Sequence, residues 1–409
     1  MYKGNSRTKR PGFRSNNSSH SRSGGFHAGR SGRSNSRGPK GQRIDPARFI
    51  NKAPAVTEAP APKPVIQHAF VDFNVDARLQ ANIVAKGYVT PTPIQDATIP
   101  HILRGSDIVG IANTGTGKTA AFLIPLIEKT LKDKKESVLI VVPTRELALQ
   151  IEEELRGFAK GLGLFGATCV GGASIGRQIS DLRHHNNFII GTPGRLKDLI
   201  ERGHLKLEKF RSIVLDEADR MLDMGFINDM RFMMSRMPKE RHTLFFSATL
   251  SPEIERLISD FLNNPVFVSV KTKETPTSVD QDVVEVRGKD KLDVLHDLLI
   301  QEGFDKVLVF GRTKHGVEKL TKKLIERGFK AESIHGNKTQ GGRIRALDLF
   351  KRDHVQVLVA TDVAARGLDI AGVSHVINYD IPATYDDYVH RIGRTGRGDK
   401  KGKALTFVE

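Results

Sequence analysis

From residue 65 onward the sequence repeats one rhythm: a short β-branched run, a polar or glycine-containing cluster, and then a helical stretch. Parallel strands need a long crossover connection, usually a helix, so this alternation indicates βαβ units and a parallel sheet. The expected strands form two sets, at 107–111, 138–142, 188–190, 212–215 and 243–246, and at 306–310, 331–334, 355–360, 375–379 and 404–408. We therefore expect an α/β fold with two parallel-sheet domains.

The stretch between the two sets, residues 270–281, is polar and has no hydrophobic periodicity. We interpret it as an interdomain linker, which assigns residues 65–269 to an N-terminal domain and residues 282–409 to a C-terminal domain. The chain has 409 residues, which exceeds the usual size of a single hydrophobic core, so its length also favours two domains.

The first 64 residues differ from this body in composition. Residues 1–43 contain 11 Lys or Arg and no Asp or Glu, among many Gly, Ser and Asn. They contain too little apolar surface to offset the entropy of ordering, so we expect a disordered basic tail. We expect residues 53–64 to form an extended, semi-rigid Pro/Ala linker. The tail either tethers RNA without sequence preference, which we favour, or only keeps the protein soluble.

The formal net charge of +17 makes a polyanion the expected partner, with nucleic acid ahead of an anionic membrane surface. Residues 1–64 hold 14 basic and 2 acidic residues, so they carry +12 of this charge and the remaining chain +5. The single cysteine, Cys169, excludes an intramolecular disulfide and fits a reducing compartment. No apolar run reaches the roughly 18 to 20 residues that span a bilayer, and no signal peptide is evident. We expect a cytoplasmic protein without a membrane segment.

Polar clusters follow many of the expected strands, with the sequences ANTGTGKT, PTRELA, GTPGR, DEAD, SAT, FGRT, HGN and ATD. In a parallel sheet, ligands bind in the crevice outside the carboxyl ends of the strands. We therefore expect each domain to gather its clusters on one edge, and two such edges to face each other across a cleft.

The first cluster indicates a phosphate-binding loop. It follows an expected strand, precedes a helical stretch and retains Gly115 and Gly117, although Ala112 replaces the first glycine of the general pattern. Glycines let backbone N–H groups turn toward phosphate oxygens at a helix N-terminus. Lys118 can reach the β and γ phosphates and the Thr119 hydroxyl can ligate Mg²⁺, whereas the alternative is a glycine-rich turn with an unrelated lysine. The expected nucleotide contacts of this loop are Ala112, Asn113, Thr114, Gly115, Thr116, Gly117, Lys118 and Thr119.

The acidic cluster at 216–219 directly follows the expected strand 212–215. A carboxylate at a strand's carboxyl end, downstream of a phosphate loop, is where the metal-side acid of such an ATPase belongs. We expect Asp216 to hold Mg²⁺ through water, and Glu217 to orient and deprotonate the attacking water. Without the phosphate loop, a solvated helix start would be the better interpretation.

Seven motifs together closely resemble the DEAD-box RNA helicases of superfamily 2, and they occur in that family's order: 112–119, PTRELA at 143–148, TPGR at 192–195, DEAD at 216–219, SAT at 247–249, ATDVAARGLD at 360–369 and HRIGRTGR at 390–397. The resemblance covers residues 70–409. It implies two tandem RecA-like domains, ATP and Mg²⁺ as cofactors, and RNA as the partner.

The resemblance also implies an adenine-recognition element upstream. The sequence GYVTPTPIQ at 87–95 contains Thr90 and Gln95, and Phe70 precedes it. The Gln95 amide has the donor and acceptor that match adenine, and Phe70 can stack on the base, which would select ATP over GTP. The alternative makes Phe70 a core residue and Gln95 a residue of a helix N-terminus. In the C-terminal domain, Asp369 would accept a ribose hydroxyl.

Arg394 and Arg397 look like the arginine fingers of the family, which neutralise charge on the γ-phosphoryl group. Arg391 and His390 are expected to link to the acidic motif and to 247–249 instead. The residues expected to couple these motifs are Asp219, Ser247, Thr249, His390 and Arg391. The alternative for 390–397 is a basic surface helix.

The remaining clusters suit a nucleic-acid backbone, because hydroxyls, exposed N–H groups and guanidinium groups bind phosphate and sugar without reading bases. The expected RNA contacts are Pro143, Thr144, Arg145, Gly171, Gly172, Thr192, Pro193, Arg195, Arg312, Thr313, Gln340, Arg343, Thr361 and Asp362. Taken singly, each could instead be a helix cap or a surface residue.

These features predict a monomeric RNA-dependent ATPase that unwinds short RNA duplexes or remodels RNA–protein complexes, with proteins of ribosome assembly or RNA decay as partners. Three alternatives stay open: a DNA helicase of the same superfamily, an ATP-switched RNA clamp, and a non-enzymatic RNA chaperone that acts through the basic tail.

Deleting residues 1–43 should weaken RNA binding and flatten its salt dependence, because fewer counterions are then released from the phosphates. The measurement is fluorescence anisotropy of labelled RNA over a range of salt concentrations. A chain that keeps the tail but carries Gln at its Lys and Arg positions should behave like the deletion. An unchanged salt slope in both variants would leave the tail only a solubilising role.

Overall fold

The computed structural model describes residues 66–113, 115–270, 279–365, 370, 372–396 and 401–408. Several expectations concern residues outside these ranges: the basic tail and Pro/Ala linker at 1–64, Thr114, residues 271–278 of the interdomain linker, Asp369 and Arg397. No helix in the described ranges is long and apolar enough to cross a membrane.

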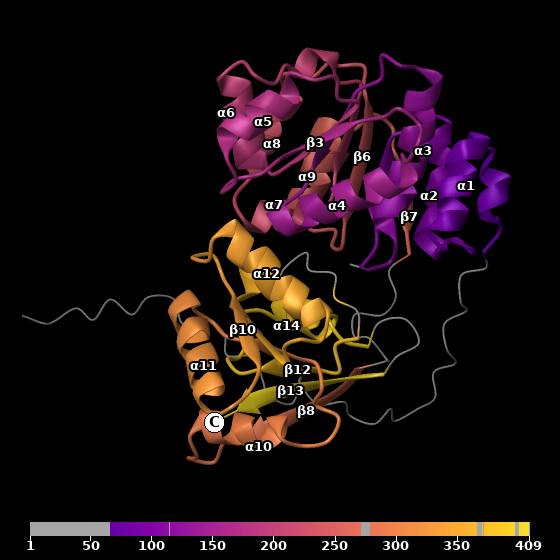
Figure 1. Cartoon of the computed structure of the whole chain (residues 1–409). Coiled ribbons are helices and arrows are strands. Elements are labelled where there is room, and N and C mark those ends of the chain that lie inside the picture. Colours follow the sequence, from indigo (N-terminus) through magenta and orange to yellow (C-terminus); the bar gives the residue numbers. More distant parts are fainter. Residues whose placement is uncertain are drawn as a thin grey trace, which may run out of the picture. The chain divides into compact units, whose positions relative to one another are not determined.

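The N-terminal domain is built on a seven-stranded sheet whose strands all pair in parallel (Figure 1). The strands are β1 (Ile108–Ile111), β2 (Val138–Val141), β3 (Gly166–Cys169), β4 (Phe188–Gly191), β5 (Ser212–Leu215), β6 (His242–Ser247) and β7 (Val266–Ser269). Their spatial order is β3-β4-β2-β5-β6-β1-β7. The helices are η2 (Phe70–Phe73), α1 (Ala77–Ala85), α2 (Pro93–Leu103), α3 (Lys118–Lys132), α4 (Arg145–Phe158), α5 (Ile175–Leu182), α6 (Pro193–Glu201), η3 (Leu207–Lys209), α7 (Ala218–Asp223), α8 (Ile227–Met234) and α9 (Pro252–Phe261).

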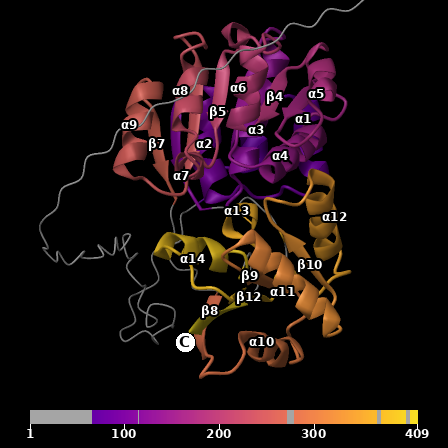
Figure 2. The same cartoon turned by 90° about the vertical axis from the view of Figure 1, so that its left-hand side faces the viewer.

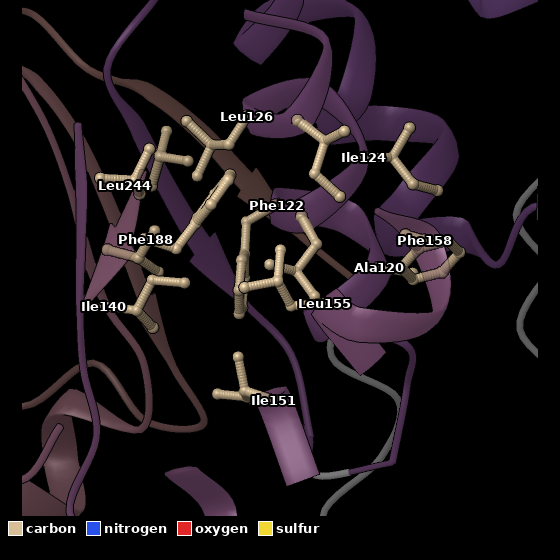
Figure 3. Packing of buried hydrophobic residues seen from close by; sticks show 14 of the residues in the cluster. Ala120, Phe122, Ile124, Leu126, Ile140, Ile151, Leu155, Phe158, Phe188 and Leu244 are labelled. Atoms are coloured by element: carbon tan, nitrogen blue, oxygen red, sulfur yellow. The ribbon is translucent and has the colours of Figure 1, made fainter. Parts of the chain in front are cut away.

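The central strands of this sheet are buried on both faces. Successive side chains of a strand point to opposite faces, so neighbouring residues enter different apolar clusters. Ile140 and Leu244 pack with helices α1 to α4, whereas Leu139 and Phe245 pack with helices α6 to α9. Figure 3 shows part of the first cluster, where side chains of α3 and α4 meet those of the strands. Burial on both faces explains why β2 is uniformly apolar rather than alternating.

The C-terminal domain contains a six-stranded parallel sheet with the order β10-β11-β9-β12-β13-β8 (Figure 2). Its strands are β8 (Val279–Glu285), β9 (Val307–Phe310), β10 (Ala331–Ile334), β11 (Val357–Ala360), β12 (His375–Asn378) and β13 (Gly402–Val408). Its helices are α10 (Lys291–Leu299), α11 (Lys314–Glu326), α12 (Gln340–Lys351), α13 (Asp362–Ala365) and α14 (Tyr385–Ile392). Helices α10 and α11 cover one face, α12 and α13 cover the other, and α14 packs on β8 and β13.

The expected α/β fold with two parallel sheets is confirmed, and each expected strand is present with small differences at its ends. Three further strands, β3, β7 and β8, escaped the sequence interpretation. β3 has the sequence GATC with one β-branched residue, and β7 is an edge strand with half-exposed and exposed residues in alternation. β3 therefore lacks a run of apolar β-branched residues, whereas β7, with the sequence VFVS, has one.

Strand β8 corrects the expected linker, because it begins at Val279, inside the range 270–281. Val279 and Gln281 are buried whereas Asp280 and Asp282 are exposed, which is the period of two expected for a strand at the sheet edge. The exposed aspartates made this segment resemble a polar linker. Only its pairing with β13 distinguishes it as a strand.

The single cysteine of the chain should report on unfolding of the N-terminal domain. Cys169 lies at the end of β3 with no exposed surface, and burial raises the pKa of its thiol to about 12. A raised pKa keeps the thiol protonated and unreactive at neutral pH and up to pH 9. A maleimide or disulfide reagent should therefore react only as fast as the domain opens, and urea should accelerate labelling. Rapid labelling of the folded protein that follows thiolate formation between pH 7 and 9 would contradict this burial.

Candidate nucleotide and nucleic-acid site

The strand order divides the carboxyl edge of the N-terminal sheet into two halves. On one side β3, β4 and β2 lead into the expected RNA contacts, and on the other β6 leads into the expected coupling segment and β1 into the expected nucleotide contacts. The segments that follow are 171–172, 192–195 and 143–145 on the first side, and 247–249 and 112–119 on the second. Strand β5 lies between β2 and β6, so the acidic motif at 216–219 lies on the boundary between the two halves.

The phosphate loop connects β1 to α3, and α3 begins at Lys118. Gly117 has a φ of 91°, in the left-handed region, and a Cβ at this position would overlap the Gln95 side chain. Lys118 is buried, and its Nζ donates to the carbonyl oxygen of Ala112 at 2.9 Å. The Thr116 hydroxyl donates to the carbonyl oxygen of Asn113 at 2.8 Å. These bonds hold the loop around a lysine that can turn toward a phosphate at the helix N-terminus.

Gln95 ties helix α2 to the phosphate loop. Its Oε1 accepts from the backbone N–H of Thr92 at 2.9 Å, and its Nε2 donates to the carbonyl oxygen of Gly117 at 3.0 Å. The side chain lies in the first turn of α2 and is buried. Both ends of the amide therefore have protein partners in this structure, and its contact with adenine stays a prediction.

Phe70 is a core residue in this structure, as the alternative to adenine stacking predicts. Its ring is buried in the first apolar cluster and makes edge contacts with Phe73 and Tyr88, with ring centroids 5.8 Å apart in both pairs. In this structure the ring packs in the core. Thr90 is exposed nearby in sequence. Stacking of Phe70 on adenine stays a prediction.

Asp216 is buried, and its Oδ1 accepts a hydrogen bond from the backbone N–H of Glu217 at 2.9 Å. Burial raises the pKa of its carboxyl to about 6, and the positive charge of Lys118 opposes this rise. A buried carboxylate that is short of positive charge is suited to receive a cation. Thr119, the other expected metal ligand, follows Lys118 in the first turn of α3.

Glu217 is held by a residue that the sequence interpretation missed. Arg220, one turn along α7, donates from Nη1 to Oε2 of Glu217 at 2.8 Å, and both side chains are buried. Glu217 itself has a φ of 53°, which is unusual for a residue with a side chain. The only available signal was an arginine directly after DEAD, and sequence spacing does not show where such a side chain turns.

Asp219 joins the acidic motif to the loop after β6. Its Oδ2 accepts from the backbone N–H groups of Ala248 and Thr249, both at 3.0 Å, and from the Thr249 hydroxyl at 3.1 Å. The Ser247 hydroxyl donates to the carbonyl oxygen of Thr249 at 2.8 Å. The structure therefore brings together Asp219, Ser247 and Thr249, three of the residues expected to couple the motifs.

The other half of this edge gathers polar groups around the starts of α4 and α6. Thr144 is the N-cap of α4, and its hydroxyl accepts from the backbone N–H of Leu147 at 3.3 Å. The Arg145 guanidinium lies so close to Gly171 and Gly172 that a Cβ on Gly172 would overlap it. Arg195 donates to Gln178 Oε1 at 2.8 Å and to the carbonyl oxygen of Ala173 at 3.3 Å. Thr192 and Pro193 begin α6.

The C-terminal sheet places its candidate residues in the same way. Thr313 and Thr339 are the N-caps of α11 and α12, and Gln340 and Arg343 lie in the first turn of α12. The backbone N–H of Arg312 donates to Asp380 Oδ2 at 2.7 Å. Thr361 precedes α13. These residues follow β9, β10 and β11, which lie together on one side of the sheet.

The Arg391 guanidinium donates hydrogen bonds to residues of its own domain. Its Nε and Nη2 donate to the two oxygens of Asp362 at 2.5 and 2.8 Å, and its Nη1 donates to Asn378 Oδ1 and to the carbonyl oxygen of Asp380. The expected link of Arg391 to the acidic motif stays a prediction. A guanidinium that is 2% exposed needs such partners to offset its desolvation. Asp362 is correspondingly engaged, although it was expected to contact RNA.

Arg394 follows α14 and is buried. The next residue, Thr395, donates from its hydroxyl to the carbonyl oxygens of Val373 and Ser374 at 2.5 and 3.2 Å. These bonds anchor the turn that carries Arg394. His390 lies half-buried in the last turn of α14.

Two family models match the chain: DEAD/DEAH box helicase over residues 92–257, and Helicase conserved C-terminal domain over residues 290–399. The ATP-dependent RNA helicase CshA of Limosilactobacillus reuteri is 47% identical over 341 residues, which cover 83% of this chain and 69% of that protein. The CshA protein of Listeria monocytogenes is 47% identical over 342 residues, or 83% of this chain and 66% of that protein. The chain belongs to the DEAD-box helicase family.

Solved structures of this DEAD-box family have the same fold. S. cerevisiae Dbp5 bound to RNA and ADP BeF3 is 30% identical with a TM-score of 0.75, and the match covers 84% of this chain and 90% of that one. Mss116p bound to ssRNA and AMP-PNP is 29% identical with a TM-score of 0.76, covering 86% and 77%. A DEAD box protein from the hyperthermophile Methanococcus jannaschii is 39% identical with a TM-score of 0.50, covering 84% and 94%. The two parallel-sheet domains are thus the RecA-like domains of a DEAD-box helicase.

In this DEAD-box protein, Asp219→Asn should destabilise the N-terminal domain by roughly 1 to 3 kcal/mol, because a neutral amide replaces a buried acceptor of three hydrogen bonds on one oxygen. Thr249→Val removes one of the three and should cost about 1 kcal/mol. Urea unfolding followed by circular dichroism measures both. Equal stability of Asp219→Asn and wild type would show that the link between 216–219 and 247–249 contributes nothing to folding.

Proposed function

We propose that this DEAD-box protein is an ATP-dependent RNA helicase that couples RNA-stimulated ATP hydrolysis to local duplex unwinding or remodelling of RNA–protein complexes. The observation that carries the proposal is the position of β5, which lies between the strands that precede the expected RNA contacts and the strands that precede the expected nucleotide contacts. The names of the CshA relatives and the RNA present in the Dbp5 and Mss116p structures support RNA as the nucleic acid.

Hydrolysis would follow from the groups around the acidic motif. Lys118 would contact the β and γ phosphates, and Glu217 would orient a water molecule and accept its proton. The water oxygen bonds to the γ-phosphorus while the bond from that phosphorus to the bridging oxygen of ADP breaks. Arg394 and Arg397 would neutralise the charge that develops on the phosphoryl oxygens.

Asp216 and Thr119 would hold Mg²⁺. Carboxylate and hydroxyl oxygens are the ligands that this ion prefers, and it is usually bound through one or two protein groups together with phosphates and water. Within the described part of the chain no group of three or more His, Cys, Asp or Glu is arranged for a metal, which agrees with a site completed by the nucleotide. The bound ion would neutralise phosphate charge and reverse the burial effect that raises the pKa of Asp216.

Coupling to RNA would arise because both ligands need both domains. The expected RNA contacts and the expected nucleotide contacts are each divided between the two sheets, so each ligand favours the arrangement that the other requires. Hydrolysis should then depend on RNA, because only that arrangement brings the arginines to the γ-phosphate. We further propose that the protein is a cytoplasmic monomer that acts in ribosome assembly or RNA decay.

The rival functions separate in one set of assays. Single-stranded RNA should stimulate ATPase activity more than DNA of the same sequence, and Lys118→Ala should abolish both ATPase and strand separation. Equal stimulation by DNA would favour a helicase without RNA preference. Stable ATP-dependent retention of RNA without strand separation would identify a clamp, and strand annealing that survives Lys118→Ala would identify a chaperone.

Glu217→Gln should retain ATP and RNA binding while turnover falls by about two to four orders of magnitude, because the amide cannot accept the water's proton. Nucleotide affinity, RNA affinity and steady-state ATPase are measured on the same preparation. The exposed glutamate variant Glu253→Gln provides the control and should keep wild-type turnover. Unchanged turnover of Glu217→Gln would remove Glu217 from its assigned role.

A further inference from the structure

A buried ion pair lies directly behind the DEAD sequence. Among the residues that the structure describes, Arg220 is the largest fully buried side chain, at 2% exposure. Its Nη1 donates to Oε2 of Glu217, whose side chain is 4% exposed. Removing two such charges from water costs several kcal/mol per ion, so a buried pair is weak evidence for a role in stability. We therefore look for a role of this ion pair in the reaction rather than in stability.

The backbone conformation of Glu217 also indicates a functional role for this ion pair. A φ of 53° is strained for a glutamate and persists only when the surroundings determine it. Glu217 is the residue just before α7, and the left-handed turn brings its carboxylate back over the first turn of that helix, where Arg220 lies. Strain of this kind collects at functional sites because it fixes a side chain in one place.

Arg220 is itself fixed by the neighbouring motif. Its backbone N–H donates to Oδ1 of Asp219 at 3.0 Å, and the other oxygen of Asp219 accepts from Ala248 and Thr249. A continuous set of contacts therefore runs from the loop after β6, through Asp219, to Arg220 and then to the Glu217 carboxylate. A shift of that loop would be transmitted to Glu217 through the start of α7.

We propose that Arg220 is a positioning residue for ATP hydrolysis, holding Oε2 of Glu217 so that Oε1 is directed to the attacking water. This inference rests on the proposed function, in which Glu217 accepts the water's proton. A planar guanidinium suits the role because it is always charged and offers donors in a rigid arrangement, whereas a lysine ammonium is a flexible point charge. Arg220 does not take part in proton transfer, and it is not expected to contact ATP or RNA.

The test compares Arg220→Met with Arg220→Lys, each alone and combined with Glu217→Gln. Arg220→Met should lower kcat by about a hundredfold, the cost of a small misplacement of a reacting group, and leave KM for ATP and RNA affinity unchanged. Arg220→Lys keeps a charged donor and should recover part of the lost kcat. In the Glu217→Gln background, single-turnover hydrolysis should be no slower when Arg220 is also replaced, because Arg220 acts only through Glu217.

Arg241→Met is the matched control within the same domain. The Arg241 guanidinium is half-buried and donates to the carbonyl oxygens of Pro238 and Phe261 at 2.9 and 3.1 Å, and it has no assigned part in the reaction. It should lower stability to urea without lowering kcat. If Arg220→Met does not fold, Arg220→Gln replaces it, since a neutral donor can still reach Oε2, and a loss of about tenfold in kcat is expected for a weakened hydrogen bond.

The inference would be overturned by wild-type kcat in a folded Arg220→Met or Arg220→Gln variant, or by the same fold-loss on replacing Arg220 with and without Glu217. An RNA-independent rise in turnover would also overturn it, because Arg220 would then restrain Glu217 rather than position it. Absence of RNA-stimulated ATPase in the wild-type protein would instead defeat the proposed function itself.

Discussion

Parallel pairing of every strand is the constraint on which the rest of the structure depends. Since all strands of a sheet run the same way, the segments that follow them emerge at one edge, and residues more than a hundred positions apart become neighbours. The phosphate loop after β1 and the loop after β6 are adjacent because β1 pairs with β6. The candidate catalytic groups are thereby carried on short segments anchored to buried strands, which restricts their movement.

The order of the strands separates the expected RNA contacts from the expected nucleotide contacts, which the parallel direction of the strands alone does not do. With β5 between β2 and β6, the segment 216–219 borders both halves of the N-terminal edge. Asp219 accepts hydrogen bonds from the loop after β6. The positive charge of Lys118, in the loop after β1, opposes the rise in the pKa of Asp216. A change in the half with the expected RNA contacts can therefore reach the half with the expected nucleotide contacts through one short segment and its hydrogen bonds.

Several candidate site residues also stabilise the fold. Thr144 and Thr313 cap helices, Gln95 joins α2 to the phosphate loop, and Asp362 neutralises the buried Arg391. A ligand that binds these groups must compete with existing protein contacts, since buried polar groups keep their partners. The affinity for ligand and the stability of each domain are consequently linked through the same atoms.

The sequence alone determined the elements and the chemistry, because both depend on near neighbours along the chain. Apolar β-branched runs specified the central strands, and glycine, lysine and acidic residues at strand ends specified a phosphate loop and a metal-side carboxylate. The edge strand β8 escaped because exposed aspartates alternate with its buried residues and hide a period of two. Only the tertiary structure decided the strand order, the burial of Phe70, and the pairings of Arg220 with Glu217 and of Arg391 with Asp362. These depend on which faces are buried together and on the direction each side chain takes once water is excluded, and linear spacing contains neither.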